Sequence, residues 1–163
     1  MSSGNSTDVA ARAALVAGAA ALAHGDDLAL GLRTLLDAVA RPLGVASGAI
    51  VVRDGSGSGL EIVASYGLDA AATAGLAEAM QRPTHPVTMT FEATAPTYDV
   101  APMNPGGPRL RSHLPLIVTR GRTPRVLGVL ALAHDDDIAP EAKPIIGAAA
   151  DLAAARIERQ LGG

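Results

Sequence analysis

The residues that most resemble parts of a catalytic or ligand-binding site lie in short, isolated groups. Gly55-Ser-Gly-Ser-Gly59 has the glycines of a phosphate-binding loop. Phosphate loops, however, run from a strand into a helix and continue into Gly-Lys-Ser/Thr, and this stretch does neither. Its glycines bracket Ser56 and Ser58, but a hydrolase nucleophile needs a Gly-x-Ser-x-Gly turn that opens a helix. We therefore interpret residues 54–58 as a hairpin turn.

Side chains that could ligate a metal ion or attack a substrate are also sparse. The chain has no Cys, which excludes disulfides, thiolate metal sites and cysteine nucleophiles. The histidines show no ligand spacing such as His-x-x-x-His; they are His24, His85, His113 and His134. The acidic run at residues 135–137 precedes a predicted helix, and such runs cap helices more often than they bind Mg²⁺ or Ca²⁺. We therefore expect no catalytic residues, no metal site, no cofactor and no enzymatic activity.

Composition and charge narrow the class of protein further. The chain has 163 residues, 48% of them hydrophobic, which suits one substantial core. Lys and Arg number 13 against 16 Asp and Glu, so no basic excess favours nucleic acid or an anionic membrane surface. The alanine-rich stretch 13–23 is too short to span a bilayer, and the polar stretch 1–8 lacks the basic residues of a signal peptide. We expect a cytoplasmic protein that binds neither nucleic acid nor membrane.

The hydrophobic pattern predicts the elements that would position any site. Ser6-Thr-Asp8 offers N-cap chemistry for an alanine-rich helix through about His24, and Asp26-Asp27 opens a second helix that ends before Pro42. The rest of the pattern predicts, in chain order, a hairpin of strands at 48–53 and 59–66, a helix over 69–81, a strand over 86–92, an irregular proline-rich loop over 93–108, a second hairpin of strands at 110–119 and 125–134, and a long helix from 139. Pro115 predicts an edge position or a bulge in its strand.

This order of elements predicts an α+β fold. Hairpins interrupted by helices favour a central antiparallel sheet flanked by helices. We expect the N-terminal and C-terminal helices to pack on one face of that sheet.

Four features of the C-terminal third occur together in one known family. They are Arg111-Ser-His-Leu-Pro-Leu116, a turn glycine at Gly121, Leu127-Gly-Val-Leu-Ala-Leu132 and an alanine-rich helix over 145–159. In this order they resemble a GAF domain, and the resemblance extends over about residues 26–160. It implies a stand-alone bacterial type of GAF domain. We expect a disordered tail over 1–7 and a single GAF-like domain over 8–161.

The sequence also departs from the family pattern. Ile138 stands where many GAF domains have Phe, and no Asn-Lys-Phe-Asp-Glu-like string is present, which argues against the cyclic-nucleotide phosphodiesterase subgroup. Because Cys is absent, the covalent attachment of bilin and the methionine-sulfoxide reductase chemistry of other GAF proteins are excluded. The resemblance then leaves regulation by a small molecule or by a protein partner.

The resemblance implies that a ligand would lie between one sheet face and the irregular segment, which corresponds here to residues 85–113. The candidate ligand-binding residues are Tyr98, Arg111, His113, His85 and Asp99, with Met89, Phe91 and Met103 as apolar candidates. Arg111 and His113 share a strand face by alternation. We expect Arg111 to hold an anionic or amide-bearing ligand and Tyr98 to stack on it or donate its hydroxyl. Met89 and Phe91 also suit an ordinary core, and Arg109 a solvated loop.

Two functions remain open. The first is a small-molecule-sensing regulatory domain in signal transduction that acts on a separate output protein. The second is a ligand-free interaction or dimerisation module of the same fold. A sensor needs an enclosed, partly polar cavity beneath residues 93–108, whereas an interaction module does not. Small-residue faces on both terminal helices predict a homodimer, unless these faces cover the sheet of their own domain.

Overall fold

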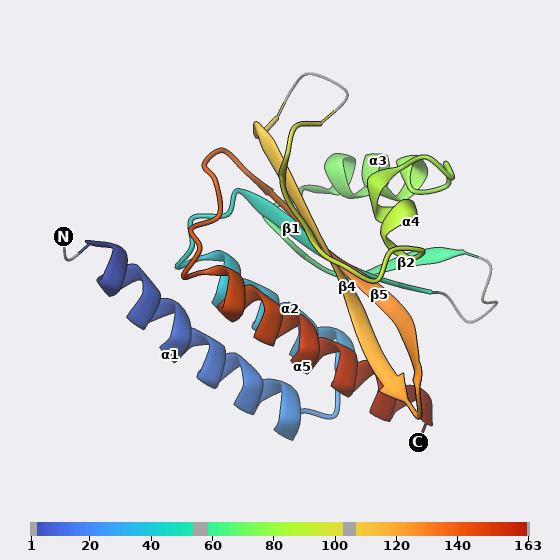
Figure 1. Cartoon of the computed structure of the whole chain (residues 1–163), viewed down its shortest axis with the longest axis horizontal. Coiled ribbons are helices and arrows are strands. Elements are labelled where there is room, and N and C mark those ends of the chain that lie inside the picture. Colours follow the sequence, from blue (N-terminus) through green and yellow to red (C-terminus); the bar gives the residue numbers. More distant parts are fainter. Residues whose placement is uncertain (1–2, 54–58, 103–106, 163) are drawn as a thin grey trace.

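The computed structural model describes residues 3–53, 59–102 and 107–162. Its helices are α1 (Ser3–His24), α2 (Leu28–Ala40), α3 (Ala70–Ala79), α4 (Pro86–Thr90) and α5 (Lys143–Gly162), and its strands are β1 (Ser47–Arg53), β2 (Leu60–Tyr66), β3 (Thr97–Val100), β4 (Leu110–Arg120) and β5 (Thr123–His134) (Figure 1). Among the described residues, no helix has the length and hydropathy needed to cross a bilayer.

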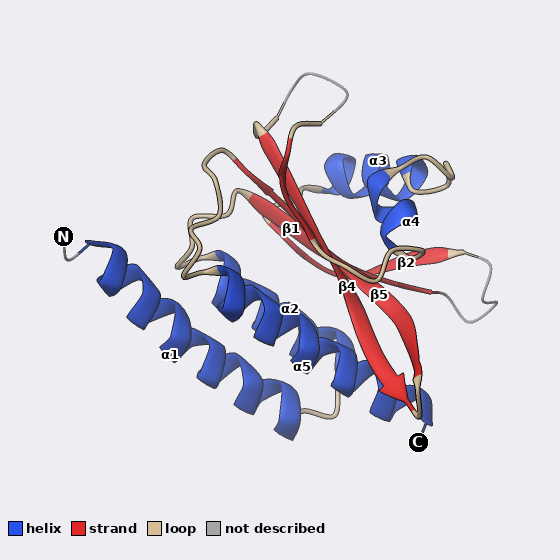
Figure 2. Cartoon of the chain, viewed as in Figure 1, coloured by secondary structure: helices blue, strands red, loops and turns tan. Residues whose placement is uncertain are grey.

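The strands form one antiparallel sheet in the order β2-β1-β5-β4-β3. Helices α2 and α5 cover one face, and α1 lies outside them as an outer layer (Figure 2). Helices α3 and α4 lie on the other face. This arrangement confirms the predicted α+β class, with the terminal helices on one side of the sheet.

The main core lies between the sheet and the pair α2–α5. Helix α2 begins where the Asp27 carboxylate accepts a hydrogen bond from the Leu30 N–H at 3.1 Å, so the predicted start of a helix at Asp26-Asp27 is confirmed. Its predicted apolar stripe is buried against the sheet and α5. The largest side chains of this core include Leu32, Leu35, Ile50, Leu116, Leu132 and Ile146.

A smaller core lies on the other face. Ala49, Val51 and Val129 of the sheet pack with three side chains from and around α3 and α4, namely Met80, Val87 and Phe91. Because both faces are covered, β1 and the second half of β5 are continuous apolar runs rather than strict alternations.

The prediction of a strand over 86–92 was wrong, because residues 86–90 form helix α4. The His85 Nδ1 accepts the Val87 N–H at 3.2 Å, and the Thr90 hydroxyl donates to the Pro86 carbonyl at 2.6 Å, so local hydrogen bonds close the turn. Val87 and Phe91 are buried, whereas Met89 between them is 56% exposed. The burial period is therefore four residues, and the alternation of apolar side chains was misleading.

Other element boundaries also differ from the predictions. Part of the expected loop 93–108 forms β3, because its backbone pairs with β4. Helix α1 begins at Ser3, so residues 3–7, expected as a disordered tail, are helical. Helix α5 begins at Lys143 instead of 139, after a turn closed by the Ala142 N–H and the Ala139 carbonyl.

Pro115 occupies the edge position that its lack of an N–H predicted. Strand β3 pairs with β4 only at Arg111 and His113, so the side of Pro115 away from β5 has no strand neighbour among the described residues. A β-bulge follows at Leu116 and Ile117.

Candidate functional site

Three of the predicted ligand-binding residues come together beneath α4. His85 is the N-cap of that helix and is half-buried, Arg111 and His113 lie on β4, and the three are close enough for their charges to interact. Arg111 and His113 share one strand face, as alternation predicted. We call these three residues the histidine–arginine cluster.

Burial and nearby positive charges favour the neutral form of both imidazoles in this cluster. Burial lowers the pKa of His113 to about 4, helped by the nearby positive charges of His85 and Arg111. Burial, and then Arg82, also lowers the pKa of His85. An anion placed among these nitrogens would act in the opposite direction and raise the pKa of both imidazoles.

The Arg111 guanidinium folds back onto the backbone. Its Nη1 donates to the carbonyls of Pro108 and Leu110, the latter at 3.1 Å. Burial lowers the pKa of Arg111, while Asp135 acts in the opposite direction. Arg111 therefore stabilises the start of β4, and its remaining donors are what it could offer a ligand.

Tyr98 and Asp99 are not part of the histidine–arginine cluster. Because Thr97 is paired with His113, the next residue, Tyr98, points to the opposite sheet face and packs on the main core. The Lys143 Nζ lies 4.8 Å from the centroid of the Tyr98 ring. Burial, and then Asp99, raises the pKa of Tyr98.

Asp99 belongs to a hydrogen-bond network that sequence reasoning missed. Its N–H donates to Ser112 Oγ at 3.1 Å, and its carboxylate accepts the Ile138 N–H at 2.8 Å. Ser112 Oγ lies 2.8 Å from His134 Nε2, and His134 Nδ1 lies 2.7 Å from the Asp136 carbonyl. Since a carbonyl only accepts, Nδ1 carries the proton and Ser112 donates to Nε2.

This serine–histidine pair has the contacts of a catalytic dyad but not the access. Ser112 is 0% exposed, so its hydroxyl meets no substrate in this conformation. The network instead joins β3, β4 and the segment leading to α5, and it holds Asp99 at a positive φ of 58°. No sequence signal links Ser112 to His134, because only the register of β4 with β5 places them together.

The remaining candidate residues lie outside the histidine–arginine cluster. Phe91 is buried in the smaller core with the Arg53 guanidinium 4.7 Å from its ring centroid, and Met89 is exposed. Exposed Arg109 donates its N–H to the Asp135 carboxylate at 3.1 Å, so Asp135 binds a loop rather than capping a helix. Met103 lies outside the described residues.

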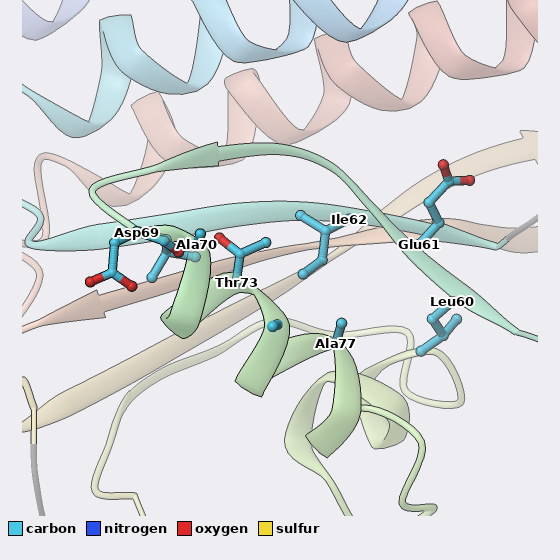
Figure 3. Close-up of a pocket in the computed structure, with 9 residues that line it drawn as sticks. Leu60, Glu61, Ile62, Asp69, Ala70, Thr73 and Ala77 are labelled. Atoms are coloured by element: carbon cyan, nitrogen blue, oxygen red, sulfur yellow. Dashed lines mark hydrogen bonds between the residues drawn. The ribbon is translucent and has the colours of Figure 1, made fainter.

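A groove lies at the opposite edge of the sheet, between β2 and α3 (Figure 3). Its volume is about 850 Å³, and its walls are mainly apolar side chains such as Leu60, Ile62 and Leu68, with Asp69 at one end. Sequence reasoning placed no ligand here. No group of three or more His, Asp or Glu side chains in the described part of the chain could hold a metal ion.

Comparison with known proteins supplies a family context for the fold. No protein-family model matches the chain, and no curated protein matches it in sequence. Among solved structures, it is similar to the GAF domain of a phosphoenolpyruvate-protein phosphotransferase from Coxiella burnetii, with a TM-score of 0.74, 14% identity, and coverage of 95% of this chain and 98% of the other.

Two further structures show the same similarity. A methyl-accepting chemotaxis protein gives a TM-score of 0.65 at 19% identity, covering 87% of this chain and 95% of the other. Free methionine-R-sulfoxide reductase from Neisseria meningitidis gives a TM-score of 0.67 at 15% identity, covering 94% of this chain and 93% of the other. The strand order, the helices on both faces and these similarities lead to one conclusion: the chain has the fold of a GAF domain.

Proposed function

We propose that this domain is a regulatory module of signal transduction that pairs with a second copy of itself through helix α1. The observation that carries the proposal is an exposed apolar stripe on α1. Similarity to the fold of a chemotaxis protein domain supports the signalling context.

Between Val9 and Ala23 helix α1 has one charged residue, Arg12, and only the side that faces α2 and α5 is buried. Its inner face packs on α2 and α5 through Ala11, Leu15, Gly18 and Leu22. Its outer face carries small and β-branched residues at alternating four- and three-residue steps, and all of them are exposed; they are Val9, Ala13, Val16, Ala20 and Ala23. The two valines are 66% and 70% exposed.

This spacing is typical of the contact positions of a two-helix coiled coil. The small side chains of the stripe would let the axes of two such helices approach closely. A copy of the same stripe is complementary to it, which favours a symmetric homodimer. The alanine face of α5 contributes little, because Ala149, Ala150, Ala153 and Ala154 are buried within the domain. The proposed pairing therefore rests on α1 alone.

Light scattering at micromolar protein concentration tests this function. We expect a dimer for the native chain and a monomer for Val16→Glu, because a carboxylate in the seam would be desolvated on pairing. Ala10→Glu changes an exposed residue of the same helix outside the stripe and should remain dimeric. A native chain that is monomeric would contradict the proposal.

A second function, the sensing of a small anion that regulates a separate output protein, is favoured by the histidine–arginine cluster. A carboxylate or phosphate metabolite bound there would gain charge-assisted hydrogen bonds from Arg111. At about one hundred times its Kd, a ligand raises the free energy of unfolding by about 2.7 kcal/mol, which thermal-shift screening detects. Loss of the shift in Arg111→Gln would support the cluster as the site, and no shift with any anion would contradict it.

A further inference from the structure

Helix α3, which forms one wall of the groove, lies on the opposite side of the sheet from α1 (Figure 1). Four residues of α3 line the groove at positions i, i+3, i+4 and i+7, so one face of the helix forms the wall. They are small side chains, Ala70, Thr73, Ala74 and Ala77. No residue of α3 is fully buried, and Leu76 packs on the smaller core.

The other wall is an edge strand, β2, that lacks the prolines of the opposite edge. The opposite edge, β3, has only four residues, is flanked by Pro96 and Pro102, and is distorted at Asp99. Strand β2 has seven residues and no proline. Edge strands with free backbone groups bind further strands unless charge, proline or a bulge prevents it.

One bulge does interrupt β2, and it limits the available edge. Ile50 pairs with Ala64 and Val51 with Ile62, so Val63 is the extra residue. The regular segment before the bulge is Leu60–Ile62, and all three of its residues line the groove. The free backbone edge and the apolar wall therefore coincide.

The charge of the groove and the directions of its side chains define which peptide would fit into it. Ile62 points toward α3, whereas Glu61 points away from it (Figure 3). An added strand alternates in the same way, with one set of side chains entering the groove and the other lying beside Glu61. The residues that line the groove include two acids, Glu61 and Asp69, and no base.

We propose that this groove binds an extended peptide segment of a partner protein, which adds to β2 as a further strand and alternates apolar with basic side chains. Main-chain hydrogen bonds to Leu60–Ile62 supply affinity, and the alternate side chains supply specificity. This binding site is independent of the pairing of α1.

The test uses a short acetylated and amidated peptide of alternating Val and Lys, labelled for fluorescence polarisation. We expect saturable binding to the full chain and slower hydrogen exchange at those amides of Leu60–Ile62 that point away from β1. Ala74→Leu places a larger side chain in the groove and should weaken binding by at least about tenfold. Ala71→Leu places the same side chain on an exposed position of α3 outside the groove and should leave binding within about twofold.

Two peptide controls separate strand addition from simple apolar contact. N-methylation of one set of alternate amides removes the hydrogen bonds to β2, and methylation of the other set does not, so only one of the two peptides should bind. Replacing Lys by Glu should abolish binding. The proposal is overturned if no peptide binds, if both methylated peptides bind equally, or if the Glu peptide binds as well as the Lys peptide. It is also overturned if the native chain alone shows protection of Leu60–Ile62 that increases with protein concentration, since a second copy would then occupy the edge.

Discussion

Acid should destabilise this domain through His113. The imidazole is buried beneath α4 and has a pKa of about 4 in the folded chain, against an ordinary value of 6.5. Between these values the unfolded chain binds a proton that the folded chain does not. The free energy of unfolding therefore falls as pH decreases from 6.5 toward 4, and the stabilisation is fully present only above the unfolded pKa.

The size of this effect follows from the two pKa values. Each unit of difference corresponds to about 1.4 kcal/mol, so the complete contribution of His113 is about 3 kcal/mol. Between about pH 7 and about pH 4.5 the native chain should lose about 2 kcal/mol of stability at this site alone.

Urea unfolding of the native chain and of His113→Gln at both pH values measures the effect. The carboxylates titrate in both proteins. The difference between the two proteins in how the free energy of unfolding depends on pH therefore isolates the contribution of His113. In parallel, NMR titration of the native chain reports the imidazole directly. Equal pH dependence of the two proteins, or an His113 midpoint near 6.5, would refute this explanation.

Three further substitutions test the stability of the strands and helices that position the candidate site. Gly128→Ala should lower the free energy of unfolding by at least about 2 kcal/mol, because the added Cβ would clash with the Val51 carbonyl oxygen inside the sheet. Gly75→Ala on α3, where a Cβ meets nothing within 4 Å, should instead raise it by about 0.5–1 kcal/mol in the same urea titration. Ser112→Ala should cost about 1–3 kcal/mol, since it removes the acceptor of the Asp99 N–H and the donor to His134. A Ser112→Ala variant as stable as the native chain would show that the network does not hold β3.

Local signals in the sequence predicted most of the fold. The Asp27 cap, the stripe of α2, and the β-rich runs around two turns each act within a few residues, and the structure confirms them. Two of the elements that were predicted wrongly, α4 and β3, also depend on contacts outside their own residues. The Thr88 hydroxyl donates to the Met80 carbonyl, and the Asp99 N–H donates to Ser112 Oγ.

The site was predictable only in part. Alternation correctly placed Arg111 and His113 on one face, but it could not show that Tyr98 faces the other side, because that depends on the register of β3 with β4. The groove beside β2 has a sequence signal in the spacing of Ala70, Ala74 and Ala77, but small residues at that spacing equally suit a closely packed helix. Only the open space beside Ile62 distinguishes a groove from a closely packed helix.

The pairing of α1 can be tested most directly by disulfide cross-linking, because the chain has no Cys of its own. Val16 lies at the middle of the outer stripe, so it would meet its counterpart whether the two helices run parallel or antiparallel. Under mild oxidation we expect the Val16→Cys variant to form a covalent dimer rapidly, and the Ala10→Cys variant to do so slowly. Equal, slow cross-linking of both variants would contradict the proposal that α1 forms the interface.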